Sequence, residues 1–220
     1  WVHAVATGMA SHLAAATIGL ASQCHARTRW DDGLALLAAA EPLLQADPAA
    51  LAQLQCSRAL LASNRSDDAE AARLARQALR LVARRGDARL LRASLFILGQ
   101  SLRCLGDLAA AQRCYAQSLR RARLDGDPHG EAMNLHTLGE IAGLRGQHAD
   151  AAALLRQSLD VQQRIGVLHA DTITDLGLAL HQGGDAAGAA ATFARARASL
   201  NPQLPGTEHT HLAYCEALAA

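Results

Sequence analysis

The stretch "LGDLAAAQRCYAQSL" (residues 105–119) returns twice along the chain in a changed but recognisable form. The later copies read "LRGQHADAAALLRQSL" (144–159) and "GGDAAGAAATFARARASL" (183–200). Each copy has a turn of small residues, then an alanine, then a bulky residue one helical turn further on. Self-similarity at a fixed period is typical of repeat proteins, so this pattern indicates a fold that is built from repeated units.

The three copies keep one internal spacing. A glycine follows a leucine, a second glycine comes seven residues later, an alanine five after that, and a large residue four beyond the alanine. The repeat period is 40 residues and then 38. In copy order, these positions hold Gly99, Gly139 and Gly177; Gly106, Gly146 and Gly184; Ala111, Ala151 and Ala189; and Tyr115, Leu155 and Phe193.

Earlier parts of the chain carry weaker copies. Forty residues before Gly99 the same offsets reach Ala59, Ser66, Ala71 and Ala75. A further copy is suggested when residues 27–44 are set against residues 63–81. We therefore expect about five repeats.

The spacing predicts a helical hairpin in each repeat. Apolar positions recur at intervals of three and four, which indicates amphipathic helices. The second glycine falls where a helix end requires a left-handed residue. An Ala or Gly midway along each helix lets the two backbones approach closely, and the large residue fills the space that the small residues leave. One hairpin cannot bury its apolar stripe alone, so successive hairpins must stack.

Composition supports an all-α fold. Half of the 220 residues are apolar and only 3% are aromatic, and Ala, Leu, Arg and Gln are strong helix formers. The five cysteines form no CxxC pair and no zinc-type cluster with histidine, which favours a reducing, cytoplasmic compartment. The sequence begins with Trp1 rather than Met, so we expect it to be a piece of a longer chain.

Residues 4–24 carry no Asp, Glu, Lys or Arg, and this length could suggest a membrane span. The segment is rich in Ala, Gly, Ser and Thr and contains His12, so it is too weakly apolar for that role. We predict a buried first helix and no membrane association.

We expect a single repeat domain over residues 1–220. Its hairpins should span residues 8–45, 49–84, 88–123, 128–164 and 170–200, followed by a terminal helix at 206–219. Pro42 should kink the second helix or end it early. Asp87, Asp127 and Asp171 are the expected N-caps. The eleven predicted helices are 8–26, 31–45, 49–63, 67–84, 88–104, 107–123, 128–144, 147–164, 170–182, 185–200 and 206–219.

This spacing of Gly, Ala and large residues resembles the tetratricopeptide repeat (TPR), most closely over residues 90–200. The period departs from the usual ~34 residues, and aromatic residues expected early in the first helix of each repeat are mostly absent. Longer repeats with a Gly-Asp linker resemble the sensor arrays of bacterial MalT-like LuxR regulators and signal-transduction ATPases. The resemblance implies a right-handed α-solenoid that binds a peptide, a partner protein or an inducer in a concave groove.

In the family that the chain resembles, the first helix of each repeat lines the groove. The family's carboxylate clamp of Lys, Asn and Arg is absent, because the matching positions hold residues such as Cys56, Leu60 and Thr137. We therefore expect no binding of EEVD-type chaperone tails. The candidate groove residues are Phe96, Gln100, Arg103, Met133, His136, Glu140, Asp171, Thr174, Asp175 and His181.

Charge is uneven along the chain. Residues 58–123 carry 14 Arg and 5 acidic residues, whereas residues 124–220 carry 5 Arg and 11 acidic residues. The distal half of the groove should favour a cationic or polar ligand, although such charges are also typical of ordinary solvated faces. Direct nucleic-acid binding is not expected, because stacking aromatics and a recognisable reading module are both missing.

One cluster raises the question of catalysis. His136 and Glu140 lie one turn apart on a predicted groove helix, with Asp171 and Asp175 expected on the next inner helix. These residues could bind a metal or perform acid–base chemistry, but we interpret them as a polar, hydrogen-bonded groove wall. His209 and His211, two residues apart on a helix, should point to different faces. Motifs such as HExxH, Walker A and GxSxG are absent from the sequence.

The sequence thus predicts a non-catalytic binding module without cofactor or metal. We expect it to be the sensor or interaction part of a larger bacterial regulatory protein, acting in signal transduction or transcription regulation. Its partner would be a protein, a peptide or a small effector. The alternatives are a structural adaptor for a multiprotein assembly and, third, an enzyme that uses the cluster around His136 and Asp171. The sequence leaves the oligomeric state open.

Overall fold

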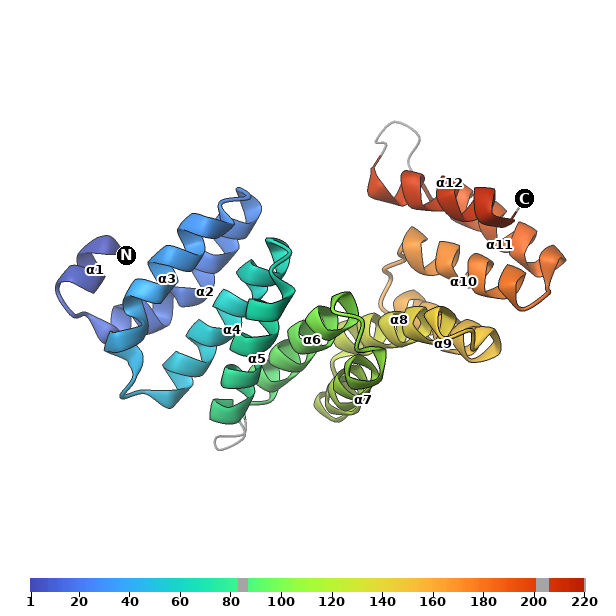
Figure 1. Cartoon of the computed structure of the whole chain (residues 1–220). Coiled ribbons are helices and arrows are strands. Elements are labelled where there is room, and N and C mark those ends of the chain that lie inside the picture. The colour runs from blue at the N-terminus through green and yellow to red at the C-terminus, as the bar shows by residue number, and fades with distance from the viewer. Residues whose placement is uncertain (83–86, 201–205, 220) are drawn as a thin grey trace. The chain divides into compact units, whose positions relative to one another are not determined.

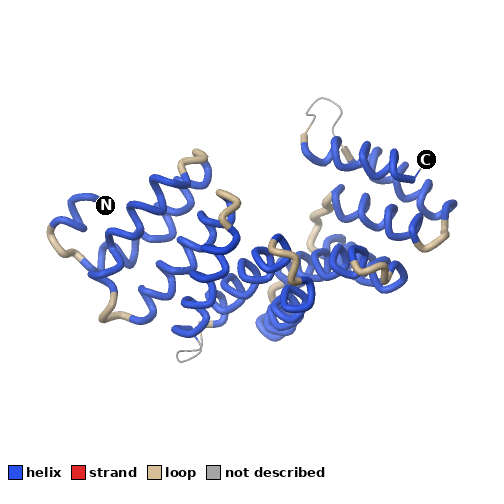
Figure 2. The backbone as a smooth tube through the Cα atoms, viewed as in Figure 1, coloured by secondary structure: helices blue, strands red, loops and turns tan. Residues whose placement is uncertain are grey.

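The computed structural model describes residues 1–82, 87–200 and 206–219 and shows twelve α-helices there, with no strand in these ranges (Figures 1 and 2). The predicted all-α fold is confirmed. The helices are α1 (Val2–Ala6), α2 (Ala10–Ala26), α3 (Trp30–Leu44), α4 (Pro48–Asn64), α5 (Asp68–Val82), α6 (Ala88–Cys104), α7 (Leu108–Asp125), α8 (Pro128–Leu144), α9 (His148–Arg164), α10 (Ala170–Gln182), α11 (Ala186–Ser199) and α12 (Thr207–Ala219).

The chain divides into two compact units, Trp1–Arg121 and Ala122–Ala220, with the boundary inside α7. The first unit holds α1 to α6 and most of α7, and the second holds the end of α7 and α8 to α12. A single repeat domain over residues 1–220 stays a prediction.

Within each unit, helices pack in chain order. In the first unit α4 packs against α3 and α5, and α6 against α5. In the second unit α8 pairs with α9 and α10 with α11, while α10 also packs against α9 and α12 (Figure 1). Consecutive packed pairs of this kind are what the repeat spacing predicts.

A small residue on the first helix meets a large one on the second in three hairpins. A Cβ atom placed on Gly177 would lie 2.5 Å from Cε1 of the Phe193 ring, which is closer than real Cβ contacts. The glycine is therefore required by close packing. The three pairs, with the nearest distance to that ideal Cβ, are Gly99–Tyr115 at 2.9 Å, Gly139–Leu155 at 2.7 Å and Gly177–Phe193 at 2.5 Å.

The turn between the helices of a hairpin uses a left-handed residue, as predicted. Gly106, Gly146 and Gly184 have φ values of 85°, 75° and 89°. Ser66 occupies the same place in the degenerate copy and has a φ of 63°. A residue with a Cβ is disfavoured in this conformation, which identifies Ser66 as a strained member of the series.

Aspartate caps start several helices. The side chain of Asp87 accepts a hydrogen bond from the backbone N–H of Leu90, and Asp127 accepts one from Gly130. The prediction of Asp171 as an N-cap is wrong, because α10 begins at Ala170 and His169 is its N-cap. Asp171 thus lies in the first turn of the helix, where its carboxylate faces another helix.

The first predicted helix, 8–26, is corrected by the structure. A short helix, α1, precedes it, and Gly8 with a φ of 68° separates the two. The buried residues of α2 form one stripe, so only one face of the helix is covered. This stripe consists of Leu13, Thr17, Ala21 and Cys24.

None of the described helices has both the length and the apolar character needed to cross a membrane.

Pro42 does not end its helix early. Helix α3 continues to Leu44, two residues beyond the proline. Ala40 and Leu44 on either side of Pro42 are fully buried, and their packing holds the last turn in place. The last two residues of the predicted helix 67–84 lie outside the described residues.

Candidate ligand-binding site

The candidate groove residues on α6 belong to the first unit. Phe96 is half-buried and packs edge-on against Tyr115, with ring centroids 5.4 Å apart and an interplanar angle of 74°. Phe96 therefore packs against Tyr115, the residue that also contacts Gly99 in the same hairpin. Gln100 and Arg103 are also half-buried, and Nε of Arg103 is enclosed by protein.

The candidate residues on α8 and α10 lie in the second unit and differ in exposure. Met133 is 50% exposed and is one of several large apolar side chains on the surface of the described chain. Thr174 is 1% exposed, and its hydroxyl donates to the carbonyl of Ala170, so it offers nothing to a ligand. Thr174 was expected on the groove surface, and the structure instead places it in the buried core. His181 lies half-buried in the last turn of α10.

Two of the candidates form the centre of the site. Nε2 of His136 on α8 lies 2.7 Å from Oδ2 of Asp175 on α10. The side chains are 23% and 14% exposed, so the pair is largely shielded from water. This contact joins the inner helices of two successive hairpins, which the sequence predicted only as neighbours.

The structure adds His211, which sequence reasoning set aside. From α12, Nε2 of this residue lies 3.1 Å from Oδ1 of Asp175, and Nδ1 lies 3.2 Å from Oδ1 of Asp171. One imidazole thus contacts two carboxylates that are one turn apart on α10. Asp175 in turn contacts two histidines, so it is the central residue of a hydrogen-bonded network that joins α8, α10 and α12.

The contacts shift the pKa values of His136, Asp175 and His211. A hydrogen bond to Asp175 is the main reason that the pKa of His211 is raised to about 11, and Cys215 and Asp171 add to it. Burial acts against the charged form of His136, yet its hydrogen bond to Asp175 raises its pKa above the ordinary value. Burial likewise opposes ionisation of Asp175, but the two histidines hold its pKa below the usual range. The contacts act in one direction: the carboxylate of Asp175 favours the charged form of each histidine, and the histidines favour the ionised form of Asp175.

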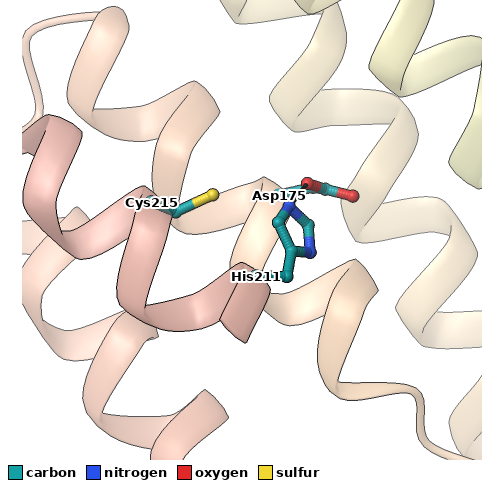
Figure 3. Close-up of side chains that lie close together, drawn as sticks. All are labelled: Asp175, His211 and Cys215. Carbon is teal, nitrogen blue, oxygen red and sulfur yellow. Dashed lines mark ion pairs between the residues drawn. The ribbon is translucent and has the colours of Figure 1, made fainter. Parts of the chain in front are cut away.

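Two overlapping groups of side chains have the composition of metal ligands. One comprises Asp175, His211 and Cys215, whose side chains lie close together (Figure 3). The other comprises His136, Glu140 and Asp175. In each group the possible ligand atoms lie within 4.8 Å of one another. The cluster read from the sequence thus exists, but it extends to α12.

A separate pocket lies in the first unit and was missed by sequence reasoning. It has a volume of about 590 Å³ and opens between α3, α4 and α5. Gln55 donates to Oε1 of Glu41 over 2.8 Å, and Arg58 pairs with the same carboxylate. The pocket is lined by Glu41, Pro48, Leu51, Gln55, Gln77, Arg80 and Leu81.

Residues 88–164, which form α6 to α9, match the family described as Tetratricopeptide repeat. The match covers two of the hairpins with the small-on-large contact described above. No curated protein matches the sequence.

Solved structures with a similar fold cover most of the chain. BtubC (BKLC) from P. vanneervenii has a TM-score of 0.78 at 19% identity, over 93% of this chain and 91% of that one. A signal transduction ATPase with numerous domains (STAND) and a tetratricopeptide repeat sensor, from Pyrococcus horikoshii, has a TM-score of 0.75 at 16% identity, over 92% and 30%. A Rap protein complexed with Competence and Sporulation Factor has a TM-score of 0.68 at 14% identity, over 80% and 50%.

At these identities the likeness shows the fold, which is a TPR-like array of helical hairpins. The resemblance to TPR arrays, including that of a signal-transduction ATPase, is confirmed. Folds of this kind typically serve as non-catalytic scaffolds for protein interaction.

Proposed function

We propose that the chain is a non-catalytic binding module that takes a peptide or a protein segment on the inner helices of its second unit. The observation that carries this proposal is the exposure of Met133 beside a polar network on α8 and α10. A flexible thioether next to carboxylates and imidazoles offers a ligand both apolar contact and hydrogen bonds.

The chemistry of this surface favours a cationic or polar ligand. Asp171 keeps 39% of its side chain exposed although it contacts His211. Glu140 and His136 are partly exposed on the next inner helix. Carboxylates in such positions accept hydrogen bonds from Arg, Lys or backbone N–H groups of an extended peptide. A small effector with an ammonium or guanidinium group would use the same acceptors.

The fold and its likenesses support a broader role. We infer that the module is the sensor or interaction part of a larger bacterial, cytoplasmic regulatory protein, acting in signal transduction or transcription regulation. Its likeness to a STAND protein described with a TPR sensor and to a Rap protein complexed with Competence and Sporulation Factor supports this role. Because each hairpin contacts only its neighbours, small rotations caused by a ligand would add along an array.

The test is a selection of short random peptides displayed on phage against the full chain, followed by fluorescence anisotropy of the selected peptides. We expect enrichment of peptides with net positive charge. Met133→Arg should weaken their binding by more than about ten-fold. A chain that selects no peptide, or peptides that bind the variant as well as the original chain, would contradict the proposal.

Leu124→Arg on α7 is the matched control, because Leu124 is also an exposed apolar residue, at 80%, and lies outside this surface. It should change affinity by less than about two-fold. Small-angle scattering with and without a selected peptide then separates a sensor from a structural adaptor. A ligand-dependent change in the scattering profile supports the sensor, and an unchanged profile supports the adaptor.

A further inference from the structure

Three inner helices of the second unit each carry a pair of possible metal ligands one helical turn apart. Residues at i and i+4 share one face of a helix, so both members of a pair can reach the same space. The three faces converge on Asp175. The pairs are His136 and Glu140 on α8, Asp171 and Asp175 on α10, and His211 and Cys215 on α12.

Asp175, His211 and Cys215 supply one oxygen, one nitrogen and one sulfur ligand. Their ligand atoms lie within 4.8 Å of one another, and Cys215 is only 1% exposed. A mixed set of carboxylate, imidazole and thiolate suits Zn²⁺, which commonly has four ligands. Calcium and magnesium prefer oxygen ligands alone, so the sulfur and the imidazole argue against both.

The neighbours of this set are arranged as the outer partners of a metal site usually are. A metal-binding imidazole generally donates its second N–H to a carboxylate, and Nδ1 of His211 lies 3.2 Å from Oδ1 of Asp171. This leaves Nε2 on the side of Asp175, where it lies 3.1 Å from Oδ1. The other carboxylate oxygen of Asp175 contacts Nε2 of His136 at 2.7 Å. Two ligands are therefore held in orientation by residues outside the set.

We propose that Asp175, His211 and Cys215 bind one Zn²⁺ ion, which joins α10 to α12, with Asp171 and His136 orienting two of the ligands. Zinc replaces the proton on Nε2 of His211 and the proton on the sulfur of Cys215, and both protons go to solvent. Three protein ligands leave the fourth position of a tetrahedral ion for water or for a group of a bound partner. Zinc binding would thus be a property additional to the proposed peptide binding, which does not require the ion.

The experiment uses the full chain, freed of metal with EDTA and then dialysed. Zn²⁺ is titrated by isothermal titration calorimetry, and Co²⁺ is added separately because a thiolate ligand gives cobalt a charge-transfer band in the near ultraviolet. We expect one Zn²⁺ per chain and the cobalt–thiolate band. Cys215→Ser should abolish the band and weaken zinc binding by more than about ten-fold.

Cys56→Ser is the matched control, since Cys56 is another buried cysteine but lies on α4 in the first unit. It should leave the band and the zinc affinity unchanged. Circular dichroism checks that the variants fold. If Cys215→Ser does not fold, His211→Gln at a half-buried position provides the same test, with loss of zinc affinity expected.

Three results would overturn the proposal. The first is no saturable zinc binding, and the second is a cobalt spectrum that does not change in either variant of the ligand set. The third is zinc binding that is lost in Glu140→Gln but retained in Cys215→Ser, which would place the ion in the other group, with His136. None of these results bears on peptide selection, so the two proposals fail separately.

Discussion

Replacement of Gly177 by alanine tests the contact that closes the hairpins. In an open helical position, Gly→Ala stabilises a helix by about 1 kcal/mol. At Gly177 the added Cβ would lie 2.5, 2.7 and 3.0 Å from three ring atoms of Phe193, which is itself buried. Overpacking of this kind costs about 1–3 kcal/mol, because the ring has no free space to enter. Set against the gain of about 1 kcal/mol, this predicts net destabilisation by up to about 2 kcal/mol.

The assay is urea unfolding followed by far-ultraviolet circular dichroism, with the slope of free energy against urea held common to all variants. Gly19→Ala is the matched control, because Gly19 lies within α2 with no atom within 4 Å of an added Cβ. It should stabilise the chain by up to about 1 kcal/mol. In a Phe193→Ala background the clash is removed, so Gly177→Ala should also become stabilising. If Gly177→Ala stabilises the original chain as much as Gly19→Ala does, the packing argument is wrong.

Three further predictions concern the polar network and the turns. The pKa of His211 is raised to about 11 from an ordinary 6.5. The protonated histidine therefore stabilises the folded chain fully below pH 6.5, and this stabilisation is lost as the pH rises toward 11. The urea midpoint of the metal-free chain, compared with that of His211→Gln across this pH range, measures the effect. Asp175→Asn should lower the free energy of unfolding by on the order of 3 kcal/mol, because it leaves two histidines without their charged partner, whereas Asp171→Asn at a more exposed position should cost less than about 1 kcal/mol. Both Gly106 and Ser66 have a positive φ, so Gly106→Ala should destabilise the chain by about 1–2 kcal/mol and Ser66→Gly should stabilise it by about 0.5–1 kcal/mol. If thermal unfolding shows that both variants shift the stability in the same direction, the assignment of the turns is wrong.

The repeat architecture could be predicted from sequence because each spacing encodes one local contact. The glycine opposite Phe193 and the left-handed Gly184 are required by geometry at fixed positions, so their period shows the hairpin directly. The short helix α1 lacks such a period and was missed. Thr174 was misplaced because neighbouring positions on a helix differ greatly in burial, and a small error in the assumed face exchanges surface for core.

The candidate site was predicted in part. His136 and Asp175 were both among the expected residues, but their contact depends on how two hairpins pack. His211 was set aside because His209 lies only two residues away, which was expected to place the two side chains on different faces of the helix. The available signal was the interval of four between His211 and Cys215, which matches that of the pairs on α8 and α10. Contacts between different repeats depend on packing that a single repeat does not encode.

A double-mutant cycle between Asp175 and His211 tests most directly whether the inner helices converge on Asp175. The free energy of unfolding is measured in urea with EDTA for the original chain, Asp175→Asn, His211→Gln and the double variant. A contact at 3.1 Å predicts an interaction energy of more than about 1 kcal/mol. Effects that add within about 0.5 kcal/mol would show that α10 and α12 do not meet at these side chains and would contradict the account.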